Sequence, residues 1–213
     1  MPRIDPRVHL PGIATRWFAK ATWRVGGDGK AAYLTFDDGP VPEMTPWVLD
    51  VLQKEGIKAT FFCVGENVSR NPEIFKRIRK EGHSVGNHTF NHLQGLKTNE
   101  ATFMKNIAKA NELIGSDLFR PPYGRMTKRQ YKSLLCNYKI IMWDIISRDF
   151  DQGISGEKVV KNVMDFVRPG SIIIFHDSVK AGRNLYYALP RVISLLKEKG
   201  FSFRKLKSQY PGN

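Results

Sequence analysis

The sequence is poor in cysteine and free of long apolar runs, and each shortage excludes a class of protein. Only two cysteines, Cys63 and Cys136, occur among 213 residues, which excludes a disulfide-rich scaffold. Both lie within apolar stretches, so we predict that they are buried free thiols. No stretch approaches the ~18 consecutive apolar residues of a membrane-spanning helix. We therefore expect a globular domain without a transmembrane segment.

The amino-terminal residues lack the apolar core of a secretory signal. Residues 1–9 are instead rich in proline and charge. The chain as written is therefore expected to stay in the cytoplasm, whereas removal of a signal before Met1 would place it outside. The expected localisation therefore depends on whether a signal peptide was removed.

Acidic residues are scarce relative to basic ones. There are 34 lysines and arginines against 20 aspartates and glutamates, a formal net charge of +14. This excess favours polyanionic partners through long-range fields. The sequence has no zinc-finger spacing, RNA-recognition signature or dense arginine run, so nucleic-acid binding is an alternative that depends on charge alone, and we expect no specific nucleic acid.

From residue 30 onward, short β-rich apolar runs alternate with longer amphipathic segments, as in repeated β-α units. This pattern predicts an α/β fold with a parallel sheet, closed as a barrel or left open, and helices outside it. The expected strands cover residues 31–35, 59–63, 84–87, 118–119, 140–143, 171–175 and 201–204. The expected helices cover residues 45–54, 72–81, 99–114, 128–135, 156–167 and 185–199.

The first 29 residues are less regular than the rest. They contain several prolines and a Gly26-Gly27-Asp28-Gly29 turn just before the first expected strand. We expect residues 1–29 to pack across the barrel and residues 30–213 to form one domain. The apolar Ile13, Trp17, Phe18 and Trp23 allow an alternative, a short surface helix in peripheral contact with a membrane.

Polar side chains follow the expected strands at the point where each strand ends. In β/α folds the carboxyl ends of parallel strands and the loops after them build the active site. Residues distant in sequence therefore converge there. The residues in such positions are Asp37, Asp38, His88, His92, Arg120, Asp149 and His176.

Two of these histidines are spaced for a metal. Only five histidines occur in the chain, and His88 and His92 are four positions apart, so one turn brings both rings to one side. Asp38 would complete a set of two histidines and one carboxylate that leaves coordination positions open, as catalytic zinc sites do. Asp37 can then remain a free carboxylate that takes a proton from water. The competing interpretation is an ordinary Asp-Asp-Gly-Pro surface turn.

These residues lie in five segments that resemble, in order and spacing, the motifs of polysaccharide deacetylases with NodB homology. The resemblance covers residues 31–204 and implies an irregular barrel of about seven parallel strands with outer helices. It also implies a hydrolase that removes N-acetyl groups from an amino-sugar glycan, either peptidoglycan or a chitin-like oligosaccharide. The five segments are residues 35–40, 87–92, 120–124, 143–150 and 172–177.

The resemblance gives each residue an expected role. Asp38, His88 and His92 would hold one divalent metal, zinc first, with cobalt, nickel or manganese as alternatives. Asp37 would be the general base, and Arg120 would orient it.

The remaining roles concern the leaving group and the sugar. The backbone N–H of Tyr123 would stabilise the oxyanion. His176 would protonate the departing amine, with Asp149 stabilising its charged form. Ile174 would line the pocket for the acetyl methyl group, and Phe150, in a position where many relatives have tryptophan, would stack on the sugar.

Three alternatives remain beside this hypothesis. The same catalytic set would serve deformylation of a lipid-linked amino sugar. A glycan-binding module without activity would share the fold but would have lost part of the set. The third is the nucleic-acid hypothesis above. The positive charge adds the expectation that the glycan substrate is anionic.

Overall fold

The structure is a computed structural model that describes residues 5–9, 15–27 and 29–208. Its strands form one sheet in the order β5-β4-β3-β2-β1-β7-β6, and β8 pairs with β1. All of the strand pairs are parallel. The strands are β1 (Ala31–Asp37), β2 (Thr60–Cys63), β3 (Ser84–Asn87), β4 (Leu118–Phe119), β5 (Lys139–Ile140), β6 (Ile145–Ile146), β7 (Ile172–His176) and β8 (Ser202–Phe203).

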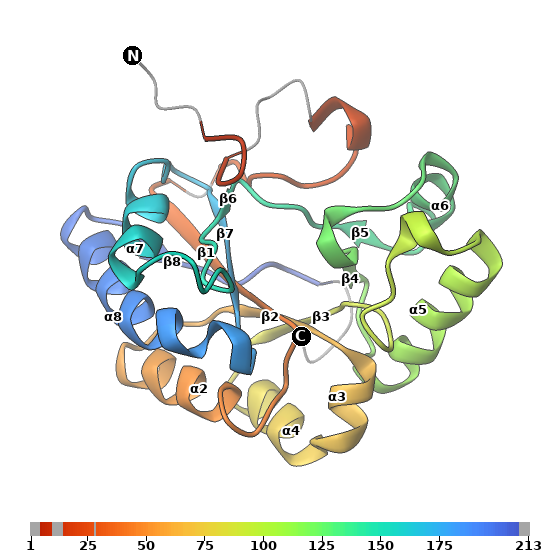
Figure 1. The fold of residues 1–213 in the computed structure, drawn as a ribbon, viewed down its shortest axis with the longest axis horizontal. Helices are drawn as coiled ribbons and strands as arrows, with labels where there is room; N and C mark the ends of the chain where they lie inside the picture. The colour runs from red at the N-terminus through yellow and green to blue at the C-terminus, as the bar shows by residue number, and fades with distance from the viewer. Residues whose placement is uncertain (1–4, 10–14, 28, 209–213) are drawn as a thin grey trace.

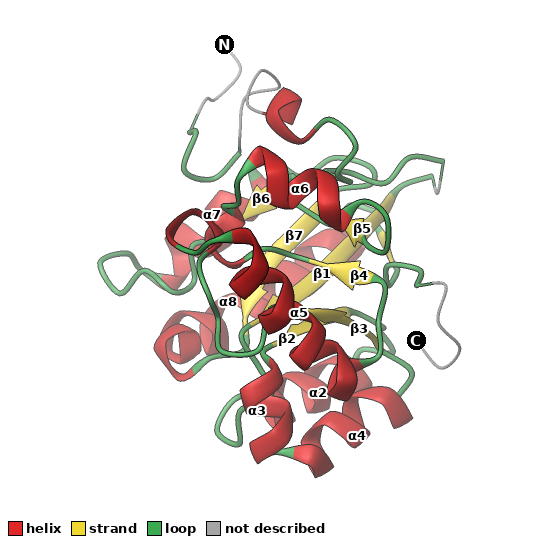
Figure 2. Ribbon diagram, turned by 90° about the vertical axis from the view of Figure 1, so that its right-hand side faces the viewer, coloured by secondary structure: helices red, strands yellow, loops and turns green. Residues whose placement is uncertain are grey.

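Helices surround the sheet on its outer side (Figure 1), which confirms the irregular α/β barrel. A view turned by 90° shows the strands enclosed between helices on either side (Figure 2). The helices are α2 (Thr45–Lys54), α3 (Gly65–Arg70), α4 (Pro72–Lys80), α5 (Glu100–Ile114), α6 (Lys128–Leu134), α7 (Gly156–Met164) and α8 (Gly182–Glu198). Short 3₁₀ turns are η1 (Arg16–Phe18), η2 (Gly95–Lys97), η3 (Pro122–Gly124) and η4 (Val179–Ala181). Within the described residues, no helix has the length and apolar character that crossing a membrane would require.

The alternation of side chains along β1 and β7 explains how the fold builds a site. Leu34, Phe36 and Phe175 face outward and join the core beneath the helices, all with no exposed surface. Their neighbours Thr35 and Asp37 must then face the barrel interior, because successive strand residues point to opposite sides. The outward faces of β1 and β7 are thus apolar, and Thr35 and Asp37 place polar groups on the lumen side toward the carboxyl end of β1.

The amino-terminal segment lies across the opening between the two ends of the strand order. Thr22 forms a parallel bridge with Ile141, just after β5, and Arg24 an antiparallel bridge with Ser171, just before β7. The carbonyl of Val8 accepts a hydrogen bond from Ile146 of β6 at 2.9 Å, and the Val8 side chain is buried. Figure 1 shows this segment above β5 and β6. Val8, Thr22 and Arg24 thus contact the strands at both ends of the sheet order, whereas Ile13 lies outside the described residues.

Some expected elements differ from the structure. The fifth expected strand, 140–143, overlaps the observed strands only at Ile140, where β5 ends, and β6 begins beyond it at Ile145. Helix α3 was not expected, since its six residues are too few to show a periodicity. Helix α8 begins at Gly182, three residues before the expected start, and includes Pro190. The prediction of two buried thiols is right for Cys63 and wrong for Cys136, which is exposed in the turn after α6.

Candidate active site

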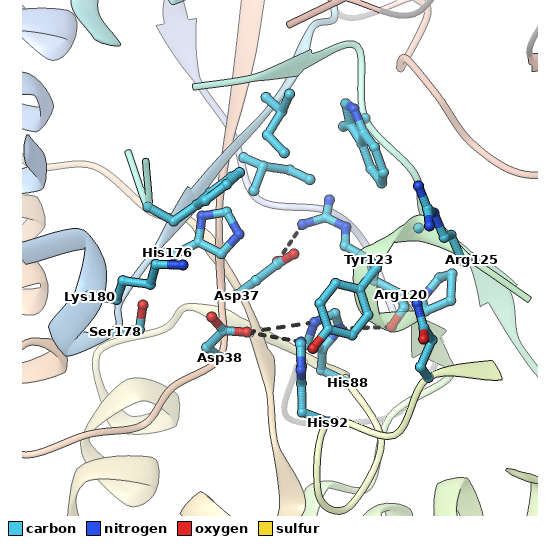
Figure 3. Close-up of a pocket in the computed structure, with 17 residues that line it drawn as sticks. Asp37, Asp38, His88, His92, Arg120, Tyr123, Arg125, His176, Ser178 and Lys180 are labelled. Atoms are coloured by element: carbon cyan, nitrogen blue, oxygen red, sulfur yellow. Dashed lines mark hydrogen bonds and ion pairs between the residues drawn. The ribbon is translucent and has the colours of Figure 1, made fainter. Parts of the chain in front are cut away.

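The polar residues at the strand ends converge on one cavity of about 640 Å³. Nine of the ten residues expected in the site line it, and the tenth, Asp149, is fully buried behind His176. Figure 3 shows the labelled side chains around this cavity, with Asp37 between His176 and Arg120. The nine are Asp37, Asp38, His88, His92, Arg120, Tyr123, Phe150, Ile174 and His176.

Strand register brings the two candidate proton-transfer groups together. Asp37 is the last residue of β1 and pairs directly with His176, the last residue of β7. Two positions earlier, Thr35 pairs with Ile174 in the same register. Because paired residues of parallel strands share a face, all four side chains lie on the lumen side. The carboxylate and the imidazole therefore flank the same volume.

Arg120 is held rigidly beneath Asp37. Its guanidinium is almost fully buried and donates from Nη1 to Asp37 Oδ1 at 2.5 Å and to Thr35 Oγ1 at 2.9 Å. Further hydrogen bonds reach the carbonyls of Ile141 and Met142, and the Phe62 ring lies 4.0 Å below the guanidinium carbon. Burial lowers the pKa of Arg120, and the charge of Asp37 opposes this shift. All this fixes the direction in which Asp37 presents its carboxylate.

Asp38, His88 and His92 form a cluster suited to a metal. One ligand atom from each lies within 4.8 Å of the others. Asp38 Oδ1 is 3.3 Å from His92 Nε2 and 3.8 Å from His88 Nε2. Ligand atoms of a tetrahedral site with ~2.0–2.1 Å bonds lie about 3.3 Å apart, so small movements of the side chains would give this geometry. Two imidazoles and one carboxylate match the donors of catalytic zinc sites.

The protonation state of His88 fits this role. Its Nδ1 lies 2.7 Å from the carbonyl of Arg120, which can only accept, so Nδ1 carries the proton and Nε2 presents its lone pair toward Asp38. Burial lowers the pKa of His88 to about 4, against the opposing charge of Asp37. The ring is therefore neutral at pH 7, as a metal ligand must be.

Several site residues adopt a backbone conformation that side chains disfavour. Asp38 has φ 85°, His92 has φ 56° and Tyr123 has φ 59°. Thr89, between the two histidines, and Arg148, next to Asp149, are also left-handed. Strain of this kind costs about 1–3 kcal/mol per residue and concentrates where side chains must be aimed at a functional point.

His176 and Asp149 form a coupled pair. Asp149 Oδ1 lies 2.8 Å from His176 Nδ1, and Asp149 Oδ2 accepts the backbone N–H of His176 at 2.7 Å. Burial lowers the pKa of His176, but the charge and hydrogen bond of Asp149, with smaller contributions from Asp38 and Asp37, raise it to about 9. The imidazolium is therefore the dominant form at neutral pH, with Nε2 available for donation.

The walls of the cavity are apolar and aromatic. Phe150 contacts His176 edge-on with ring centroids 5.0 Å apart, and Tyr123 contacts His92 edge-on at 4.7 Å. Ile174 is buried and lines the cavity. The N–H groups of the two residues after Tyr123 bond to the carbonyls of Pro121 and Pro122, and the N–H of Tyr123 itself lies outside these turn bonds.

Other residues reach the site without having been singled out in the sequence. The cavity is also lined by Trp143, Arg125 and Lys180. Asp177 is fully buried beside the first motif, and burial raises its pKa to about 8, against the hydrogen bond from Thr45. Trp143 and Asp177 lay within recognised motifs, which was the only signal for them. No periodicity or spacing marks the two cations.

Comparison with known proteins identifies similar chains. The family model described as polysaccharide deacetylase matches residues 24–138. A peptidoglycan-N-acetylglucosamine deacetylase of Bacillus cereus is 37% identical over 205 residues, covering 91% of this chain and 74% of that protein. A chitooligosaccharide deacetylase of Bradyrhizobium is 32% identical over 197 residues, covering 83% and 89%.

Solved structures share the same architecture. The crystal structure of the Bc1960 peptidoglycan N-acetylglucosamine deacetylase superposes with a TM-score of 0.84 at 35% identity, covering 92% of this chain and 94% of that one. A CE4 family pseudoenzyme of Bacillus anthracis also matches, with a TM-score of 0.77 at 26% identity, covering 86% and 66%. The fold is thus similar both to enzymes and to a protein described as a pseudoenzyme, so the activity must be argued from the site.

Proposed function

The chain belongs to the polysaccharide deacetylase family, and we propose that it hydrolyses N-acetyl groups of an amino-sugar glycan, peptidoglycan or a chitin-like oligosaccharide. The observation that carries the proposal is the complete set of groups around one cavity. Three sets of residues meet there: the candidate metal ligands Asp38, His88 and His92, the buried Arg120–Asp37 pair, and the His176–Asp149 pair. A non-catalytic binding module has no need to keep all three.

The residues at the cavity floor fit one divalent metal. Asp38, His88 and His92 would hold it, and zinc best matches their donor set, with cobalt, nickel or manganese as alternatives. When bound, such an ion supplies Lewis-acid polarisation of the amide oxygen and lowers the pKa of water. The neutral tautomer of His88 prepares the protein for this binding without the loss of a proton.

Asp37 is suited to act as the general base. Its carboxylate lies between Arg120 and the cavity, so the face turned away from the guanidinium can accept a proton from the attacking water. Attack at the acetyl carbon gives a tetrahedral centre whose oxygen takes a hydrogen bond from the backbone N–H of Tyr123. Both groups are held by hydrogen bonds or by turn geometry before substrate arrives.

His176 then serves as the general acid. The imidazolium donates its Nε2 proton to the amine nitrogen as the C–N bond breaks, and acetate and the free amino sugar leave. Asp149 accepts from Nδ1 and keeps the ring charged. Ile174 bounds the space for the acetyl methyl group, and Phe150 offers a face to the sugar ring.

The substrate glycan is proposed to be anionic. Arg125 and Lys180 line the cavity and lie on opposite sides of the reacting centre (Figure 3). Both side chains are exposed, and none of the ion pairs found among the described residues involves either cation. Cations on both sides favour a polymer whose units next to the reacting sugar carry carboxylates, as charge complementarity accelerates encounter.

Acetate release tests the activity. Zinc-loaded protein is incubated with N-acetylglucosamine oligomers and with peptidoglycan fragments, and acetate and formate are quantified. Acetate from either substrate supports the proposal, formate from an N-formyl sugar lipid in place of acetate supports the deformylase alternative, and absence of both supports a binding module.

The charge proposal is tested with the double variant Arg125→Gln, Lys180→Gln. We expect kcat/KM on peptidoglycan fragments to fall several-fold and to lose much of its salt dependence, with little change on neutral oligomers. Lys54→Gln, in α2, is a control of the same kind of charge change. Equal losses on both substrates would contradict a role in substrate charge recognition.

A further inference from the structure

The turn that presents Asp38 is held by hydrogen bonds to four of its backbone polar groups. The carbonyl of Asp38 accepts from Asn67 Nδ2 at 2.7 Å, and the carbonyl of Gly39 accepts from the N–H of Val64 at 3.0 Å. The carbonyl of Pro40 accepts from Asn71 Nδ2 at 3.1 Å. A turn held this firmly gives Asp38 little freedom to leave its left-handed conformation.

The fourth contact comes from Asp177, a fully buried residue just after the neighbouring strand β7. Asp177 follows β7, and its Oδ1 accepts the N–H of Gly39 at 3.0 Å. A Cβ added at Gly39 would lie 2.0 Å from Asp177 Oδ2, so the carboxyl group occupies the place where a side chain would be. The backbone N–H of Asp177 also donates to the carbonyl of Asp37 at 3.2 Å. Asp177 thus touches the chain on both sides of Asp38.

Asp177 is itself fixed by Thr45. The Thr45 hydroxyl lies 2.6 Å from Asp177 Oδ2 and accepts the N–H of Val41 at 2.8 Å. Thr45 and Asp177 are both fully buried. The two oxygens of Asp177 are therefore directed at Gly39 and Thr45, away from the metal cluster, and the pair has no direct contact with the cavity among its lining residues.

We propose that Asp177 and Thr45 are positioning residues that hold the strained Asp38–Gly39 turn in the shape needed for metal binding. We call the Asp177–Thr45 pair the clamp. Without it, the left-handed Asp38 relaxes, and its carboxylate moves away from His88 and His92. Metal affinity falls because the three donors no longer meet, and partners of this kind typically change affinity or activity by 10–100-fold.

Zinc titration by calorimetry of the full chain tests the proposal. Thr45→Val removes the hydroxyl at nearly constant volume, and we expect the Kd for Zn²⁺ to rise about 10–100-fold. Thr45→Ser restores the hydroxyl and is expected to recover most of the affinity. Thr60→Val is the matched control, because the buried Thr60 hydroxyl accepts a hydrogen bond from Leu206 N–H at 2.9 Å at the other end of the sheet.

The outcomes separate positioning from general stability. Weaker Zn²⁺ binding by Thr45→Val than by Thr60→Val at equal thermal stability supports the clamp. Wild-type affinity in Thr45→Val, failure of the serine variant to recover binding, or absence of Zn²⁺ binding in the unaltered chain overturns it. The measurement involves no turnover, so it stands whether or not the chain releases acetate.

Discussion

The two ends of the sheet contain the same kind of turn with different residues in it. Where the strands begin, the turns with positive φ use glycine, at Gly56, Gly82, Gly115, Gly170 and Gly200. Where the strands end, positive φ occurs at Asp38, Thr89, His92, Tyr123 and Arg148, joined by Gly124. Glycine adopts this conformation at little steric cost, whereas other residues lose about 1–2 kcal/mol. The difference teaches that non-glycine residues with positive φ gather at the end of the sheet where Asp38, His92 and Tyr123 line the cavity.

The largest expected effect is at His92, where relief of strain and loss of function should coincide. In His92→Gly we expect turnover to fall to background and Zn²⁺ binding to be lost, because one of three metal donors is gone. The metal-free variant should keep its stability or gain up to about 1 kcal/mol. Acetate release and urea unfolding of chelator-treated protein measure both.

His92→Ala is the matched control. It removes the same ligand but keeps a Cβ at φ 56°, so it should lose activity equally and be less stable than His92→Gly. Equal stabilities would show that the backbone at this position is not strained.

The sequence predicted the strand ends better than the loops that follow them. Asp37 and His176 could be placed because β1 and β7 are long enough to show a pattern and end in polar residues. The ten expected site residues do meet, since parallel strands place their carboxyl ends at one edge. Their catalytic and binding roles stay predictions.

Other features left no signal in the sequence. Strand β6, Ile145–Ile146, was not expected, because two residues show no alternation. Arg125 and Lys180 are ordinary surface cations by spacing, and only the folded chain turns them toward the cavity. Asp177 acts through contacts with residues 132 and 138 positions away, which no local pattern encodes.

The next effect concerns Asp37, which lies in regular strand beside the strained turn. Asp37→Asn should retain Zn²⁺ binding and lose about 10²–10⁴-fold in kcat, because the amide cannot accept the proton of water. Steady-state kinetics with calorimetry of Zn²⁺ binding separates the two properties. Loss of Zn²⁺ along with turnover would instead make Asp37 a ligand and extend the metal site into the strand.

A smaller effect is expected from the pH dependence of the His176–Asp149 pair. The pKa of His176 is raised from 6.5 to about 9, so its contribution to stability is complete below pH 6.5 and is lost as the pH rises through 9. Asp149→Asn removes the main raising cause. The metal-free variant should therefore show a shallower fall in stability between pH 6.5 and 9. In the Zn²⁺-loaded variant, the alkaline limb of the kcat–pH profile should move to lower pH.

Thermal unfolding across this pH range, with and without the substitution, measures the stability effect. The pKa of Asp177 is raised to about 8. Its contribution to the pH dependence of stability is the same in both proteins and therefore cancels in the comparison. Identical pH profiles for the two proteins would remove Asp149 from the control of His176.

The smallest effect on activity, and the one that completes the comparison, is expected at Gly82. This residue has φ 80° in the turn between α4 and β3, and a Cβ there would meet only Lys58 Cε, at an unstrained 3.8 Å. Gly82→Ala thus introduces the backbone cost without a clash. We expect it to lower the free energy of unfolding by about 1–2 kcal/mol and to leave kcat, KM and Zn²⁺ affinity unchanged, because the turn lies at the opposite end of the sheet from the cavity. Urea unfolding and acetate-release kinetics measure both quantities on one preparation. Gly82→Ala is the reverse of His92→Gly. It adds a side chain at a position that does not need one, whereas His92→Gly removes a side chain that the metal site needs. If Gly82→Ala alters turnover, the two ends of the sheet are mechanically coupled, and the division of strain between them is wrong.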